Sequence, residues 1–202
     1  MSALWTHQPR GKACRPIWQL LRQIDPAVQC ERKFDWLFLP KSDERCDLEE
    51  KVLSALREHC RQRKDRHPDK ARCDPDTLLA DAEIKARTRV LEFDFFLPSV
   101  NTAVEFDEGQ HFTEERKISL QCYGSLPVGF SVERWIGLCS PSRQDADPPC
   151  RDWQRAFRDA IRDIRAVQQG IGLVRIYYRD FDESECATPG ASGLLQEAIL
   201  GV

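Results

Sequence analysis

The chain has 202 residues, of which 41% are hydrophobic and 31% are charged, and it carries a formal net charge of -3. This hydrophobic content is sufficient for a buried core, which excludes a disordered or fibrous protein. The slight acidic excess excludes a protein that binds nucleic acid through an overall positive charge, so any basic surface must be local.

Nine cysteines are scattered along the chain without a CxxC pair. Their odd number and irregular spacing favour reduced thiols and a cytoplasmic protein. The amino-terminal residues MSALWTHQPRGKACRP are interrupted by polar residues and proline before an apolar segment can form, and no later run approaches membrane-spanning length. We therefore expect neither export nor insertion into a membrane.

The first half of the chain contains several predicted elements. Residues 1–45 form an amino-terminal elaboration with a short helix near residues 17–24. A helix is predicted over residues 47–60, because the leucine and valine side chains share one face and acidic residues occupy the first turn. The polar, proline-broken residues 61–76 are expected to form a loop, and residues 77–89 are compatible with a strand.

A β-hairpin is predicted next, because the runs EFDFFLP and VEFD are separated by turn residues. Alternate side chains on a strand share a face, so we expect Asp94 on one face of the first strand and Phe93 and Phe95 on the other. The same alternation places Glu105 and Asp107 together on the second strand. Pairing of the two strands would bring these carboxylates close together, where they repel each other unless something neutralises them.

Three interpretations of the acidic hairpin are open. The carboxylates could form the solvated face of an antiparallel sheet. They could also act as an acid–base pair, as in glycosidases. The third possibility is a site for a hard cation such as Mg²⁺, which prefers carboxylate oxygens. The adjacent Gln110 and His111 favour this third interpretation, because polar groups at the edge of such a site can contact a metal-bound water or a phosphate.

Two further elements are expected before the long carboxy-terminal helix. A short helix begins after Thr113, which is a suitable cap, and ends near Gly124. The run VGFSVERWIGL, residues 128–138, is compatible with a strand.

A long helix is predicted over residues 151–169, because its apolar residues form one stripe and Gly170 follows its end. Five arginines spaced four, three, four and three residues apart form a second stripe: Arg151, Arg155, Arg158, Arg162 and Arg165. Such a row beside a carboxylate–metal site suits a polyanion, because guanidinium groups bind phosphate oxygens in bidentate fashion. The alternative is a solvated face on which Asp152, Asp159 and Asp163 pair with the arginines.

Together these motifs resemble the PD-(D/E)XK nuclease superfamily, especially the branch similar to very-short-patch-repair endonucleases. In that branch a stretch like FDFYLP…IEYDG.QHF is followed by a helix with D-x-x-K and a strand like LIRIPY. The corresponding segments here are FDFFLP at 93–98, VEFDEGQHF at 104–112, Asp159-Ala-Ile-Arg162 and LVRIYY at 173–178. The resemblance covers about residues 47–180.

The resemblance implies an α/β protein with a restriction-endonuclease-like core of α-β-β-β-α-β order, in which a mixed sheet is flanked by helices. The core would span residues 46–181, with an insertion at about 113–150, and a carboxy-terminal tail over residues 182–202 would follow. The last strand of this core would be residues 173–178, and the tail would end in a short helix.

The resemblance also implies a set of site residues. Asp94 and Glu105 would hold Mg²⁺, or Mn²⁺ in its place, with help from the backbone carbonyl of Phe106 and from Glu50 on the first helix. The signature lysine belongs two residues after the glutamate, where this chain has Asp107. The catalytic candidates are Asp94, Glu105, Asp107 and Gln110, of which Gln110 could orient water. The residues expected to contact nucleic acid are Arg155, Arg158, Arg162 and His111.

The implied activity is that of a metal-dependent endonuclease that hydrolyses phosphodiester bonds of DNA, in DNA repair or in antiviral defence. RNA stays open as a substrate, and the partners would be proteins of a repair or defence complex. Since the signature lysine is replaced, the alternative is a catalytically inactive nuclease-fold subunit that binds nucleic acid or regulates a larger complex.

Overall fold

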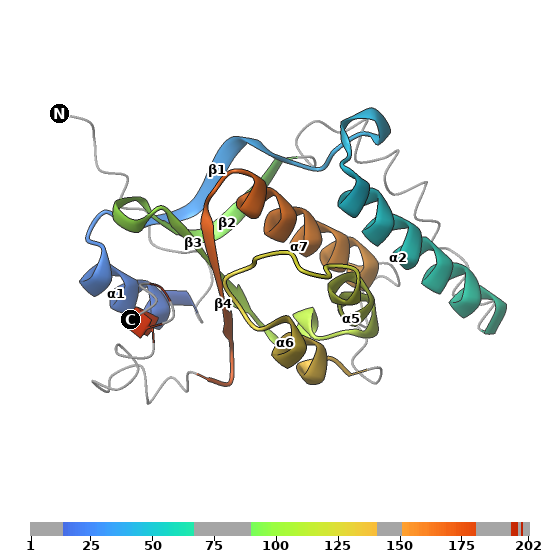
Figure 1. Ribbon diagram of the computed structural model, residues 1–202. Helices are drawn as coiled ribbons and strands as arrows, with labels where there is room; N and C mark the ends of the chain where they lie inside the picture. The colour runs from blue at the N-terminus through green and yellow to red at the C-terminus, as the bar shows by residue number, and fades with distance from the viewer. Residues whose placement is uncertain (1–13, 67–89, 141–150, 181–194, 198, 200–202) are drawn as a thin grey trace.

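The computed structural model describes residues 14–66, 90–140, 151–180, 195–197 and 199. Figure 1 shows an α/β architecture in which helices cover both faces of a four-stranded mixed sheet. The strand expected within residues 77–89 lies outside the described residues. Within the described segments, every helix is too short or too polar to cross a membrane.

The sheet has the spatial order β1-β2-β3-β4. Its strands are β1 (Gln29–Phe38), β2 (Val90–Leu97), β3 (Thr102–Asp107) and β4 (Gly172–Tyr177). β2 pairs antiparallel with both β1 and β3, whereas β3 and β4 are parallel. The predicted hairpin is therefore confirmed as β2–β3, and the predicted final strand is β4. The edge strand β1 comes from the segment expected to be an amino-terminal elaboration.

The hairpin turn is built from the short 3₁₀ segment η3 (Pro98–Val100) and Asn101. Asn101 has a φ of 48°, in the left-handed region that asparagine tolerates better than most residues. Its side-chain amide donates to the carbonyl of Gly170 at 3.0 Å. Gly170 has a φ of 64° and closes the long helix, as its position in the sequence predicts. The two turns are thereby joined at one end of the sheet.

The helices are α1 (Cys14–Ile24), α2 (Asp47–Arg66), α5 (Glu114–Gln121), α6 (Val132–Leu138) and α7 (Arg151–Gln168). The four predicted helices before residue 170 are confirmed as α1, α2, α5 and α7. Thr113 caps α5 as expected, because its hydroxyl accepts the backbone N–H of Arg116 at 3.3 Å. The described part of the tail, residues 195–197 and 199, is also helical.

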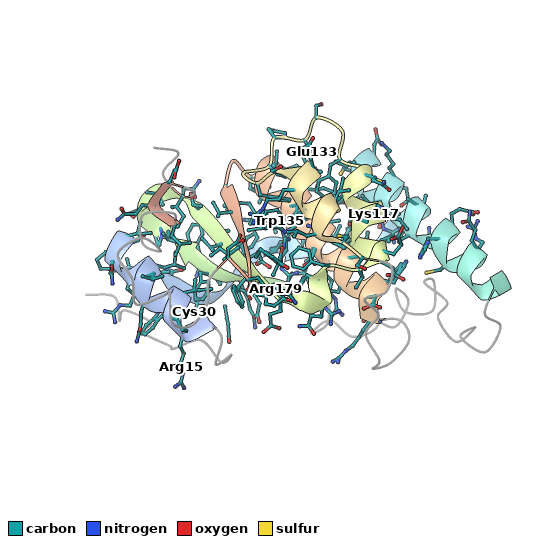
Figure 2. All side chains as sticks on the ribbon, turned by 90° about the horizontal axis from the view of Figure 1, so that it is seen from below. Arg15, Cys30, Lys117, Glu133, Trp135 and Arg179 are labelled. Carbon is teal, nitrogen blue, oxygen red and sulfur yellow. The ribbon has the colours of Figure 1, made fainter. Side chains whose placement is uncertain are left out.

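Two local predictions are wrong. α2 continues to Arg66, so the first residues of the expected loop 61–76 are helical. The run at residues 128–138 contains the helix α6, from residue 132 onwards, and no strand. The hydroxyl of Ser131 accepts the N–H of Arg134 at 3.2 Å and caps this helix, and Trp135 is buried on its inner side. Figure 2 shows Trp135 among densely packed side chains, whereas Glu133 lies at the rim.

Two apolar clusters lie on the opposite faces of the sheet. One packs against α2, α5, α6 and α7, and the other packs against α1 and the tail residues Leu195 and Ile199. Phe93 belongs to the first cluster and Phe95 to the second, so the expectation that they share a face is wrong. The alternation of β2 is broken at Asp94, between them. On β1 the neighbouring Glu31 has a φ of 50°, so both strands are irregular at this level.

Candidate functional site

The candidate site begins where the β2–β3 ladder ends. The last regular pair towards this end is Phe95 with Val104. Beyond it, the N–H of Phe106 donates to Oδ2 of Asp94 at 2.8 Å, and the N–H of Asp94 donates to Oε1 of Glu105 at 3.2 Å. Side-chain carboxylates thus take the place of backbone carbonyls as acceptors. The structure brings Asp94 and Glu105 together, as the hairpin predicted.

Both carboxylates are costly to ionise in this position. Glu105 is only 4% exposed, and burial raises its pKa well above the ordinary value, although the nearby guanidinium of Arg162 opposes this shift. Burial also raises the pKa of Asp94, against the opposing effects of the Phe106 hydrogen bond and Arg162. A cation bound between the two groups would keep them ionised.

Arg162 of α7 brings a positive charge to this pair. Its Nε lies 3.6 Å from Oε2 of Glu105 and donates to the carbonyl of Glu92 at 2.8 Å. Its Nη1 donates to Oδ1 of Asp159 at 3.1 Å. The sequence motif Asp159-x-x-Arg162 is therefore part of the site, because both side chains face the end of the hairpin.

His111 is held beside the same aspartate. It ends the short 3₁₀ segment η4 (Gly109–His111), and its Nδ1 lies 2.8 Å from Oδ2 of Asp159. Burial acts to lower the pKa of His111, but the carboxylate of Asp159 outweighs it, so the pKa is raised. No contact from the described part of the chain engages Nε2. This nitrogen can exchange a proton with a ligand at the site.

Asp107 is a buried anchor at the end of β3. Its Oδ1 accepts from Nη1 of Arg175 at 2.6 Å, and its Oδ2 accepts from Nε1 of Trp135 at 2.7 Å. Asp107 shares a face with Glu105, as expected, but both of its oxygens are already bound. A cation at Asp107 would have to compete with Arg175 and Trp135. The catalytic role expected for Asp107 stays a prediction.

A buried charge network extends from Asp107 to α5 and α7. Arg175 of β4 also binds Oδ1 of Asp163 through two nitrogens, at 2.7 and 2.9 Å. The other oxygen of Asp163 accepts from Arg116 at 2.7 Å and from the hydroxyl of Tyr123 at 2.6 Å. Sequence reasoning missed this network. The one available signal was an arginine in the centre of the apolar strand LVRIYY.

Gln110 lies at the rim of the site. Its Oε1 accepts from Arg155 at 3.4 Å, its backbone carbonyl accepts from the same arginine at 3.2 Å, and its Nε2 donates to Glu108 at 2.9 Å. None of these contacts reaches Asp94 or Glu105. The expected role of Gln110 in orienting water therefore stays a prediction that the geometry does not by itself support.

Glu50 is not brought to the carboxylate pair. Its side chain is 46% exposed and pairs with Arg45 at 3.0 Å and Arg57 at 3.5 Å. The adjacent Glu49 is the buried residue, and it accepts from Nε of Arg165 on α7 at 2.8 Å. The glutamates at the start of α2 thus fix this helix rather than extend the described site.

The aspartates of α7 are buried, so the alternative of a solvated, ion-paired face is wrong. Asp159 and Asp163 have no exposed surface, and Asp152 is 6% exposed. Two of the anticipated pairs do form, Arg162 with Asp159 at 3.1 Å and Arg155 with Asp152 at 3.5 Å. Asp163 instead pairs with arginines from other elements.

The connected charges leave a negative excess. Five carboxylates face three guanidinium groups: Asp94, Glu105, Asp107, Asp159 and Asp163 against Arg116, Arg162 and Arg175. Because burial raises the pKa of Asp94 and Glu105, ionisation of these two carboxylates would be favoured by a bound cation. Across the described ranges, no group of three or more His, Cys, Asp and Glu side chains is arranged to hold a metal. Asp94 and Glu105 could supply two ligands, and Mg²⁺ commonly completes its shell with backbone carbonyls, water and substrate phosphate.

Comparison of the chain with protein-family models, curated proteins and solved structures gives no match.

Proposed function

We propose that the chain is a divalent-metal-dependent hydrolase of phosphodiester bonds in DNA, with a restriction-endonuclease-like core. The single observation that carries the proposal is the pairing of the buried Glu105 with the half-buried Asp94 at the end of the β2–β3 ladder. Two adjacent carboxylates whose pKa values are raised by burial, despite the nearby Arg162, are costly to ionise and well placed to hold a cation.

The element order supports the proposed core. The succession α1-β1-β2-β3-α7-β4 reads helix–strand–strand–strand–helix–strand, with α2 inserted after β1 and with α5 and α6 inserted after β3. The first helix of this succession is α1, whereas the sequence motifs point to α2. Both assignments keep the carboxylates on the central strands β2 and β3.

Each residue of the site has its own role in the proposed hydrolysis. Asp94 and Glu105 would hold Mg²⁺, which supplies an activated water and charge stabilisation at phosphorus when bound. Arg162 would add positive charge beside Glu105, where the superfamily's lysine is missing. His111 would move a proton at Nε2, because Asp159 fixes the ring through Nδ1.

The second candidate function is an inactive nuclease-fold subunit that binds nucleic acid. The observation that favours it is Asp107, which occupies the position of the signature lysine and is fully engaged by Arg175 and Trp135. In this reading Arg162 and His111 would contact a bound strand without promoting its cleavage. Repair and antiviral defence are the proposed settings for either function.

The test is incubation of the purified protein with labelled single- and double-stranded DNA and RNA, in Mg²⁺, Mn²⁺ or EDTA. A Glu105→Gln variant purified in parallel controls for contaminating nucleases. Cleavage that needs a metal and is lost in the variant is expected. Binding without cleavage under all conditions would reject the hydrolase and retain the binding subunit.

A further inference from the structure

The arginines of α7 differ in what their guanidinium groups contact. Arg165 is buried against Glu49 and the carbonyl of Trp36, and Arg162 binds Asp159 and the carbonyl of Glu92. Arg155 binds Gln110. Arg158 is half-buried, yet its guanidinium makes no hydrogen bond or ion pair with any residue that the structure describes.

Arg158 also lies close to several other positively charged side chains. Burial lowers the pKa of its guanidinium, and the neighbouring positive charges of Arg162, Arg155 and Arg151 lower it further, with Asp159 as the opposing charge. A half-buried guanidinium whose neighbouring positive charges outnumber the one opposing carboxylate destabilises the free protein. An anion bound at this position would relieve that cost.

The position of Arg158 on α7 places it beside the candidate site. Arg155, almost one turn before it, reaches Gln110 on the η4 segment. Arg162, about one turn after it, reaches Glu92 and Glu105 on the hairpin. Since residues three and four apart share a helix face, Arg158 lies on the face of α7 that carries these two contacts.

We propose that Arg158 binds a phosphate group of the nucleic-acid backbone, next to the phosphodiester that meets Asp94 and Glu105. This inference rests on the proposed function for the identity of the ligand. Both ends of the Arg158 guanidinium can donate to two phosphate oxygens. The guanidinium groups of Arg162 and Arg165 already donate to protein groups. The contact would position the strand without reading its sequence, because phosphates are the same at every nucleotide.

The test measures binding of a labelled DNA duplex in EDTA, so that cleavage cannot interfere. Arg158→Gln is compared with Arg61→Gln, which removes the same charge from an exposed site on α2. We expect Arg158→Gln to bind about tenfold more weakly for every sequence and to lower the salt slope by about one unit. Arg158→Lys should recover part of the affinity, and Arg61→Gln should bind as the parent does.

Thermal unfolding separates a binding role from a structural one. Arg158→Gln should unfold at the parent temperature or above it, because like-charge crowding is relieved. Adding inorganic phosphate at constant ionic strength identifies the source of the anion. If phosphate stabilises the parent but not Arg158→Gln, while both bind DNA equally, the site serves free phosphate and the nucleic-acid assignment is overturned.

The outcomes distinguish this inference from the proposed function. A parent protein that cuts DNA, with an Arg158→Gln variant of unchanged affinity and salt slope, overturns the phosphate contact alone. A parent protein that never cuts, but whose binding depends on Arg158, supports the contact and rejects the hydrolase.

Discussion

Asp94 and Glu105 lie opposite each other on neighbouring strands, and the N–H of Asp94 donates to Oε1 of Glu105 at 3.2 Å. The N–H of Phe106 completes the exchange by donating to Asp94 at 2.8 Å. These two bonds terminate the β2–β3 ladder with side chains instead of carbonyls. The same atoms that would hold a cation therefore also satisfy the backbone, so substitutions should keep an oxygen at each position.

The first prediction concerns Glu105→Gln, which keeps a carbonyl oxygen for the N–H of Asp94 but removes the buried charge. We expect metal-dependent cleavage to fall by about a thousandfold or more, and the melting temperature to hold or rise. Cleavage rates and thermal unfolding of the parent and the variant provide the measurement. A variant that cuts as fast as the parent would remove Glu105 from the site.

The second prediction is the pH dependence of stability in EDTA. The pKa of Glu105 is raised in the folded protein above its ordinary value of 4.5, so the folded state binds this proton more tightly than the unfolded state does. Glu105 therefore costs stability as the pH rises above 4.5, up to its folded pKa. As the pH increases over this range, the melting temperature of Glu105→Gln should rise relative to that of the parent. Mg²⁺ should reduce this difference. A pH-independent difference would contradict the assignment.

The third prediction treats Asp107 as a structural anchor. Asp107→Asn removes the charge that faces Arg175 inside the protein, so the free energy of unfolding should fall by about 3 kcal/mol. Trp135→Phe removes one hydrogen bond to the same carboxylate and also part of a buried ring, and should cost about 2 kcal/mol. Denaturant unfolding measures both. If Asp107→Asn instead leaves stability intact and raises the Mg²⁺ concentration needed for half-maximal rate, Asp107 is a metal ligand, as the sequence motif suggested.

The fourth prediction concerns His111 and its partner Asp159. His111→Gln should slow cleavage by about a hundredfold or more while leaving DNA binding in place, because proton transfer and not affinity is lost. Asp159→Asn should shift the pH–rate profile to lower pH, because the negative charge that raises the pKa of His111 is removed. A pH–rate profile that is the same in the parent and in Asp159→Asn would show that His111 does not transfer the proton.

The fifth prediction uses Gln110, for which the sequence motif and the geometry differ. If Gln110 positions the attacking water, its replacement by alanine should lower the cleavage rate by about a hundredfold. Its observed contacts are with Arg155 and Glu108, so we expect a rate loss of less than about tenfold. Single-turnover rates of the parent and Gln110→Ala decide between the two. A hundredfold loss would restore Gln110 to the mechanism.

The main elements could be predicted because local chemistry specifies them. The apolar stripe of α7, the cap at Thr113 and the turn before Asn101 are all visible as residue spacing. The short run that forms α6 could not be assigned from spacing, because seven residues are too few for the periodicity of their apolar positions to distinguish a helix from a strand. Its helical state is stabilised by the burial of Trp135, which is a tertiary contact.

The carboxylate pair was predictable, but its surroundings were not. Strict alternation failed between Phe93 and Phe95 because side-chain oxygens at Asp94 and Glu105 displace the regular ladder, and the sheet is buried on both faces. Arg116 and Arg175 are charged residues that sequence patterns assign to the surface. Their burial depends on partners from distant segments, which no local pattern reveals.

The neutralisation of Asp107 and Asp163 by Arg175 also determines the order in which parts of the chain can fold. Arg175 lies 68 residues after Asp107 and is carried by β4, so during synthesis the hairpin emerges long before its counter-charge does. Until β4 docks beside β3, Asp107 and Asp163 lack this partner, and their burial is unfavourable. A nascent chain that stops before residue 172 should therefore leave Asp107 and Asp163 without Arg175, and formation of the charge network of these three residues becomes a late event in folding.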